Sequence, residues 1–261
     1  RRIGKTFLVR EVYKKDIVFS VTGLHNGLMK DQLLNFYNQL VSVNKKFAKS
    51  PVPHDWVKAF SMLTQYLDGI KTKGKKVVFI DEFPWISTAR SGFLMWFENF
   101  WNVYCAARND LIVVVCGSSA SFMIKNIVNN KGGLHNRLTC KIRLEPFNLF
   151  ETALFLRSRG IKLEEYDIVS LYMAIGGIPH YLELVPKGKS VAQIIDYLCF
   201  EPGGGLVGEF DAVFKSLFSN SDTHKLVVKS LAANRKGVTR EELLKKCKLQ
   251  QSGFFSNVLQ E

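Results

Sequence analysis

Three residues near the start of the chain, Gly4, Lys5 and Thr6, have the types and order of a phosphate-binding turn. They match the end of the pattern G-x-x-x-x-G-K-[ST], whose first glycine would lie before residue 1. A glycine lets backbone N–H groups approach phosphate closely, and a helix that begins near Lys5 would point its positive end at the same anion. We expect Lys5 to neutralise the β- and γ-phosphates of a nucleotide and the Thr6 hydroxyl to bind Mg²⁺.

Two consecutive acidic residues, Asp81 and Glu82, follow the apolar run at 77–80. This run predicts a buried strand, and open parallel sheets bind ligands at the carboxyl ends of their strands. Asp81 would then hold the Mg²⁺ ion directly or through water, and Glu82 would orient and polarise the attacking water. A strand end with two solvated acids is the alternative interpretation of these two residues alone. The phosphate-binding residues upstream favour the catalytic interpretation.

The apolar pattern predicts the elements that must position these groups. Continuous apolar runs predict strands over 17–23, 77–80, 111–116 and 140–144. Helical spacing predicts helices over 7–12, 28–47, 55–67 and 92–107, and a wholly helical chain from 147 onward. Strands that are buried on both faces and alternate with helices indicate an α/β fold, with a parallel sheet flanked by helices.

The amino-acid composition indicates which classes of molecule this protein could bind. Among 261 residues, 36 Lys and Arg oppose 23 Asp and Glu, for a net charge of +13. This excess favours nucleotide phosphates or nucleic acid, and a solvated basic surface without such a partner is the alternative. The five cysteines are widely spaced, which predicts reduced thiols in a cytoplasmic protein. The longest apolar run, 111–116, is too short to cross a bilayer, so we expect no membrane partner.

In these residues the chain resembles a P-loop ATPase of the AAA+/STAND group, close to the prokaryotic family often called archaeal-type ATPases. The resemblance covers nearly the whole chain, and its motifs occur in the family's order: 4–6, 79–83, 116–119, 137–147 and 176–181. It implies ATP and Mg²⁺ as cofactors and ATP hydrolysis as the activity. It also implies that Phe7 joins Gly4, Lys5 and Thr6 in the nucleotide-binding turn.

Four further residues take their roles from the resemblance. Ser118 matches the sensor position, where a polar side chain reads the γ-phosphate or the attacking water; a strand-end cap is the alternative. Gly177 and Pro179 match a lid motif that packs against adenine; a simple helix break is the alternative. Arg137 matches an arginine that, supplied to a neighbouring molecule, would stabilise charge on the transferred phosphoryl group. Many members of the group lack a clear arginine of this kind.

The resemblance also implies three segments: an ATPase core at 1–146, a helical lid at 147–205, and a winged-helix or helix-turn-helix module at 206–261. A capping box at Thr239 and Glu242 predicts a helix through Cys247, between one that ends near Ala233 and one that begins near Ser252. Residues 215–261 hold nine Lys or Arg against four acids, which duplex phosphates would favour. A solvated helix face, or packing against the core or another protein, is the alternative.

We therefore expect an ATP-binding protein that hydrolyses ATP with Mg²⁺ and couples hydrolysis to movement of the lid and the winged helix, with DNA as a candidate partner. Another protein, or a second copy of the chain, is also a candidate partner. The alternative is a DNA-binding or signalling adaptor in which bound nucleotide is structural and turnover is negligible. We expect both ends to be incomplete, because the strand that feeds the phosphate-binding turn would precede residue 1 and a wing hairpin would follow residue 261.

Overall fold

The computed structural model describes residues 2–71, 73–129, 132–134, 136–218, 220–234 and 236–260. The chain divides into two compact units, Arg1–Glu145 and Pro146–Glu261, and each is described by itself. The predicted border between a lid and a C-terminal module, at 205–206, stays a prediction. No helix in the described ranges combines the length and the hydropathy that a bilayer crossing requires.

The first unit is built on three parallel strands in the order β1-β2-β3. The strands are β1 (Ile17–Thr22), β2 (Lys76–Asp81) and β3 (Leu111–Val115). The helices are α1 (Lys5–Val12), α2 (Met29–Val43), α3 (Trp56–Asp68), α4 (Phe83–Ile86), α5 (Phe93–Asn99) and α6 (Ala120–Met123), with shorter helical turns η1 (Lys45–Lys49), η2 (Phe100–Cys105) and η3 (Ile124–Val128). The predicted parallel sheet flanked by helices is therefore confirmed, as are three of the four predicted strands.

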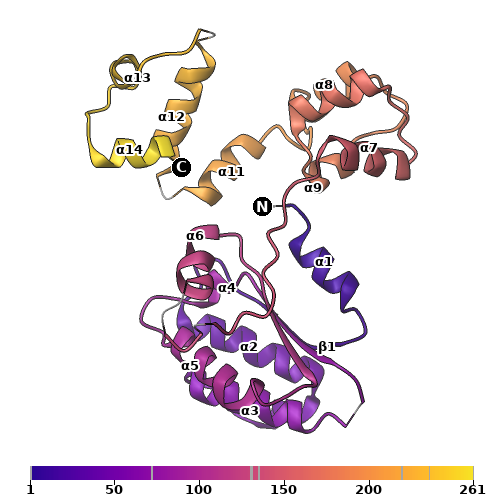
Figure 1. The fold of residues 1–261 in the computed structure, drawn as a ribbon, viewed down its shortest axis with the longest axis vertical. Coiled ribbons are helices and arrows are strands. Elements are labelled where there is room, and N and C mark those ends of the chain that lie inside the picture. The colour runs from indigo at the N-terminus through magenta and orange to yellow at the C-terminus, as the bar shows by residue number, and fades with distance from the viewer. Residues whose placement is uncertain are drawn as a thin grey trace. The chain divides into compact units, whose positions relative to one another are not determined.

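An aromatic core lies where α2, α3 and α5 meet the sheet. Figure 1 shows these three helices gathered on one side of the strands, with α1 apart from them. Trp56 is fully buried, and its ring packs against Phe36, Phe60 and Phe93 at centroid distances of 4.7–6.0 Å. Every residue of β2 is buried, because β2 is the central strand. The sheet therefore holds β2 more firmly than its two neighbours.

The fourth predicted strand, Cys140–Leu144, is wrong. This segment is irregular, and all of its residues are exposed except Leu144, which is half-buried. Its apolar residues alternate with Lys141 and Arg143, and Arg143 is paired with Glu145 at 2.5 Å. A strand needs a neighbour to bind its backbone groups, and no strand among the described residues pairs with this segment. The short apolar run was therefore too weak a signal.

The second unit is helical, as predicted. Its helices are α7 (Leu149–Ser158), α8 (Glu165–Ile175), α9 (Pro179–Glu183), α10 (Val191–Cys199), α11 (Glu209–Leu217), α12 (Ser221–Ala232), α13 (Arg240–Cys247) and α14 (Gly253–Gln260). One apolar cluster joins α7–α10, and a second joins α12–α14. The predicted capping box opens α13: the Thr239 hydroxyl accepts the Glu242 N–H, and the Glu242 carboxylate accepts the Thr239 N–H.

Gly177 is packed against the backbone of the segment that leads into α7. The Phe147 N–H donates to the Gly177 carbonyl at 2.8 Å, and the Tyr172 hydroxyl donates to the Phe147 carbonyl at 3.2 Å. A Cβ atom on Gly177 would lie 1.8 Å from that same carbonyl oxygen. The position is therefore restricted to glycine by packing within the second unit.

An ion-pair network closes the amino-terminal end of β2 and β3. Lys76, which is 7% exposed, donates to Asp110 at 2.7 Å. Arg108 binds both oxygens of the same carboxylate, at 2.8 and 3.0 Å, and also reaches Asp68 at 3.0 Å. The hydrogen bonds from Arg108 and then Lys76 hold the pKa of Asp110 well below its ordinary range. The network thus provides the buried lysine with its counter-charge.

Gly177→Ala should destabilise the second unit by about 3 kcal/mol, because the new methyl group overlaps the Phe147 carbonyl and forces the backbone apart. Thermal unfolding measured by circular dichroism checks this. Gly208→Ala is the matched control, since a Cβ there meets nothing within 4 Å. Equal melting temperatures for the two variants would show that the Phe147 carbonyl leaves room for a side chain at position 177.

Asp110→Asn should lower the free energy of unfolding by about 1–2 kcal/mol at neutral pH, because it leaves the Lys76 ammonium without its carboxylate. Solvent screening keeps the loss small, since the Asp110 side chain is 37% exposed. The folded-state pKa of Asp110 is lowered, so its contribution is complete above about pH 4 and is lost as the pH falls further. Urea unfolding at pH 7 and pH 3 measures the free energy of unfolding of wild type and variant. The difference between the two should be smaller at pH 3, and an equal difference at both pH values would contradict the stabilising role of the Asp110 carboxylate.

Candidate functional site

The turn before α1 and the end of β2 meet at the carboxyl edge of the sheet. The Thr6 hydroxyl donates a hydrogen bond of 2.6 Å to Asp81 Oδ2, across 75 positions of sequence. Gly4 caps α1 with a φ of +87°, a left-handed conformation that glycine adopts without the steric cost of a side chain. The structure therefore brings together the two groups that the sequence predicts as ligands of one metal ion.

Asp81 is 4% exposed, and both of its carboxylate oxygens are engaged. Oδ2 accepts the Thr6 hydroxyl, and Oδ1 accepts the Glu82 N–H at 3.0 Å. Its backbone carbonyl accepts the Gly23 N–H at 2.9 Å, which continues the pairing of β1 and β2 to the edge of the sheet. Two hydrogen bonds therefore hold the carboxylate, and a third holds the backbone of the residue that carries it.

Glu82 adopts a left-handed backbone conformation, with φ 45° and ψ 48°. For a residue with a side chain this costs roughly 1–2 kcal/mol, and such strain is concentrated at functional sites. The Ser118 hydroxyl donates to Glu82 Oε1 at 2.5 Å, and the Ser118 N–H donates to Oε2 at 3.2 Å. The predicted catalytic carboxylate and the predicted sensor residue are therefore direct partners.

The charges of Lys5, Asp81 and Glu82 all act on the thiol of Cys116. Cys116, at the end of β3, has its pKa raised to about 11, first by burial and then by the charge of Asp81, with Glu82 adding to the same effect. The charge of Lys5 opposes this rise. The sequence motif at 116–119 includes Cys116, but no role was predicted for this residue.

The donor set fits a magnesium ion shared with a nucleotide. Thr6 and Asp81 supply hard oxygen atoms, which Mg²⁺ prefers over nitrogen and sulfur. Within the described ranges, no group of three or more His, Cys, Asp or Glu residues could hold a metal by itself. In nucleotide-binding proteins one or two protein ligands usually hold Mg²⁺, and phosphate and water complete its coordination.

Of the four other predicted residues, two belong to the first unit and two to the second. Phe7 is 70% exposed on α1, and Arg137 is exposed on the irregular segment that follows α6 and η3. Gly177 belongs to the second unit, where its contact is with Phe147. Pro179 begins α9 at the first helical position, where proline fits without loss of a backbone hydrogen bond. Their predicted nucleotide contacts stay predictions.

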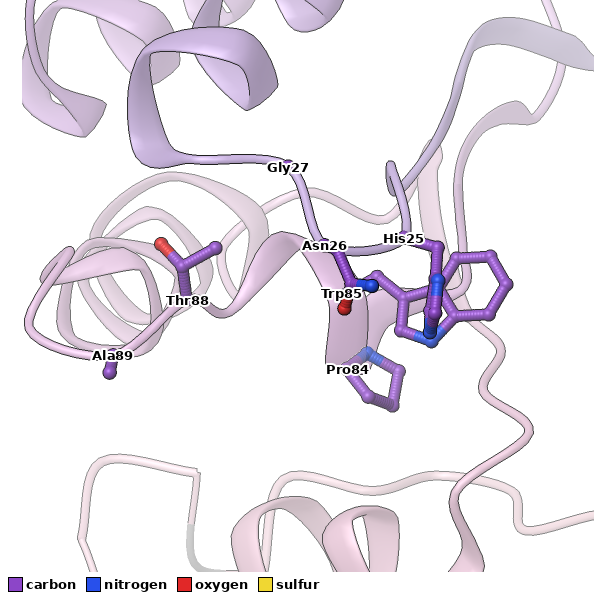
Figure 2. A pocket seen from close by; sticks show the side chains of 7 residues that line it. All are labelled: His25, Asn26, Gly27, Pro84, Trp85, Thr88 and Ala89. Atoms are coloured by element: carbon purple, nitrogen blue, oxygen red, sulfur yellow. The ribbon is translucent and has the colours of Figure 1, made fainter. Parts of the chain in front are cut away.

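A pocket of about 400 Å³ adjoins the turn that carries Glu82. Figure 2 shows the rings of His25 and Trp85 beside each other at one end, and Thr88 and Ala89 at the other. The ring centroids of His25 and Trp85 are 5.0 Å apart. Gln32, which is fully buried, holds the walls together by donating to the carbonyls of Leu24 and Trp85 at 2.7 and 3.0 Å. No pattern in the sequence predicted this pocket.

Residues 1–185 match the family described as an ATPase domain predominantly from Archaea. Among solved structures, the chain is similar to the Walker-type ATPase PABY2304 of Pyrococcus abyssi, with a TM-score of 0.54 and 13% sequence identity over 95% of this chain and 82% of that one. At this identity the likeness concerns the fold. No protein of curated function matches the chain. The matched residues include Gly4, Lys5, Thr6, Asp81 and Glu82, and the chain belongs to this family of predominantly archaeal ATPase domains.

Proposed function

We propose that this protein binds Mg²⁺–ATP at the carboxyl edge of the β1-β2-β3 sheet and hydrolyses it there. The observation that carries the proposal is the 2.6 Å contact between the Thr6 hydroxyl and the Asp81 carboxylate. These two oxygen atoms come from the helix that would bind phosphate and from the strand that would bind metal. Lys5, one residue before Thr6, would neutralise the β- and γ-phosphates from the start of α1.

When bound, the metal ion would be held by Thr6 and Asp81, and it would neutralise charge that develops on the phosphate oxygens. Gly4 contributes its backbone, since its left-handed conformation turns the chain into α1 at the point where phosphate would approach. Phe7, on the exposed face of α1, would contact the nucleotide from the side. These residues bind and orient the substrate.

Glu82 would orient the attacking water and accept its proton. Its carboxylate lies one residue beyond the metal-binding acid, and its left-handed backbone turns it toward Ser118. Ser118 would contact the γ-phosphate or the water, as the family resemblance implies. Arg137 is exposed, which is compatible with a contact to the nucleotide of a neighbouring molecule.

The helical segment 147–205 would serve as a lid. Its own apolar cluster makes it a compact body that could move as one piece. Gly177 and Pro179 would pack against adenine at the start of α9. The close contact between Gly177 and Phe147 would fix the shape of this turn and thereby present the edge of α9 to the base.

A second candidate function is duplex DNA binding by residues 206–261, which would form a winged-helix or helix-turn-helix module. The helices α12–α14 share a small core around Val227, Leu243 and Phe255, and the exposed residues of α13 include Lys245 and Lys246. The alternative to an enzyme is a cytoplasmic DNA-binding or signalling adaptor whose nucleotide is structural. ATP turnover separates the two.

Glu82→Gln should lower ATP turnover by about 100-fold or more while ATP binding persists, because the amide cannot accept a proton from water. Phosphate release and the affinity for a fluorescent ATP analogue measure the two effects. Glu11→Gln is the matched control, since it makes the same change on an exposed residue of α1. Equal turnover in wild type and Glu82→Gln would refute the catalytic assignment and favour the adaptor.

If the C-terminal module binds duplex DNA, the logarithm of the binding constant should fall linearly as the logarithm of salt concentration rises. Lys245→Ala should reduce this slope by about one, whereas Lys58→Ala, on α3 of the first unit, should leave it unchanged. Fluorescence anisotropy of a labelled duplex provides the measurement. If the protein does not bind the duplex at low salt, or if its affinity does not change with salt concentration, residues 206–261 do not bind DNA through its phosphates.

A further inference from the structure

The pocket of about 400 Å³ in the first unit is lined by residues that have no role in the proposed ATP site. One wall is the turn at 25–27, which follows β1, and the other is the segment 84–89, which follows the two acids. Figure 2 shows the rings of His25 and Trp85 beside each other, with the amide of Asn26 on the same side of the pocket. His25 is exposed and Trp85 is half-buried, so part of this aromatic surface is open to a ligand.

Packing and hydrogen bonds fix the two walls relative to each other. Gln32 is 1% exposed, and its amide donates to the Leu24 carbonyl beside one wall and to the Trp85 carbonyl in the other. A Cβ atom on Gly27 would lie 2.8 Å from Gln32 Nε2, so a glycine permits this close contact. A pocket that is formed before its ligand arrives spends little free energy on ordering its walls. The pocket is therefore a preformed site.

The side chains of the pocket fit a flat ring with polar edges. Its volume lies in the range of about 300–1,000 Å³ that small-ligand pockets occupy. Tryptophan and histidine rings stack on nucleobases, and this stacking tolerates any base because every base has a π-face. The amide of Asn26, an exposed residue of the same pocket, can both donate and accept a hydrogen bond, as the edge of a base requires. A nucleobase meets both conditions.

The charges near the pocket favour a base that is flanked by phosphates. The described residues that line the pocket include no Asp or Glu. The exposed cations Lys30 and Arg90 lie in the sequence just beyond the two walls, and the neighbouring acids Asp31 and Glu82 already accept hydrogen bonds. The net charge of +13 attracts a polyanion from a distance. A base inside a duplex is stacked and paired, so the fitting partner is a single strand.

We propose that this pocket binds one base of a single-stranded nucleic acid, packed against the rings of His25 and Trp85, while Lys30 and Arg90 neutralise the flanking phosphates. The site is separate from the proposed ATP site and from the duplex contact of residues 206–261. The Trp85 N–H donates to the Glu82 carbonyl at 2.9 Å. A bound strand would therefore lie beside the turn that bears the proposed catalytic acid.

Tryptophan fluorescence tests the proposal in the full chain. All four tryptophans belong to the first unit, so their signal does not report direct stacking of bases on residues 206–261; they are Trp56, Trp85, Trp96 and Trp101. The protein is titrated with an oligothymidylate and with an abasic strand of equal length and charge. We expect the oligothymidylate to quench the fluorescence to saturation, the abasic strand to leave it unchanged, and Trp85→Phe to remove the quenching.

His25→Ala should weaken the affinity measured by this quenching by about 5-fold or more, because one ring of the stacking pair is lost. Asn26→Gly should weaken it as well, and glycine accepts the left-handed backbone of this position, where φ is 58°. Both residues are exposed, so neither change removes a part of the core. His54→Ala is the matched control at an exposed histidine outside the pocket, and it should leave the affinity unchanged.

Equal quenching by the two strands, or wild-type affinity in both pocket variants, would overturn the proposal. Saturation by thymidine alone at the concentration that the strand requires would assign the pocket to a free nucleoside instead. A parallel loss of affinity for a fluorescent ATP analogue in His25→Ala would make the pocket a part of the ATP site and overturn its independence. ATP hydrolysis is judged separately, by the turnover of Glu82→Gln, so the two proposals can fail independently.

Discussion

The parallel register of the three strands is the constraint on which the candidate site depends. Thr22 of β1 lies opposite Asp81 of β2, and Ile80 of β2 lies opposite Val115 of β3, so all three strands end at one edge. The chain that leaves β3 therefore passes beside the acids that end β2. A shift of one residue in this register would turn the Asp81 side chain to the opposite face of the sheet and away from Thr6.

The central strand is held at both of its ends, by different interactions. At its start, Lys76 is neutralised by Asp110, which Arg108 also binds. At its end, Asp81 accepts hydrogen bonds from Thr6 and from the Glu82 backbone. The apolar residues between them are fully buried. A strand anchored by polar contacts at both ends can hold the Asp81 carboxylate in place, and the left-handed backbone follows directly at Glu82.

The sequence predicted those elements whose signals are long or chemically distinct. Continuous apolar runs identified β1, β2 and β3, and the capping box at Thr239 identified the start of α13. The strand predicted at 140–144 was wrong because a short apolar run carries no information about whether a neighbouring strand is there to pair with it. For the same reason, the sequence does not predict contacts that depend on which residues of two strands lie opposite each other.

The residues of the candidate site were likewise predictable from the sequence, whereas some of their contacts were not. Gly4, Lys5, Thr6, Asp81 and Glu82 could be chosen from motif chemistry, because phosphate and magnesium demand those residue types in that order. The hydrogen bonds from both donors of Ser118 to Glu82 could not be predicted. They depend on the left-handed backbone of Glu82, for which the local sequence gives no signal. Likewise, the contact of Gly177 with Phe147 reflects tertiary packing and cannot be read from the glycine alone.

A crystal structure of the protein with Mn²⁺ and AMP-PNP tests the central claim most directly, since manganese can be located by its anomalous scattering. The account predicts a manganese peak bonded to the Thr6 hydroxyl and held by Asp81 directly or through one water, with the γ-phosphate beside Lys5 and Glu82 facing the attacking position. A nucleotide bound elsewhere, or a metal ion that touches neither Thr6 nor the coordination sphere of Asp81, would contradict it.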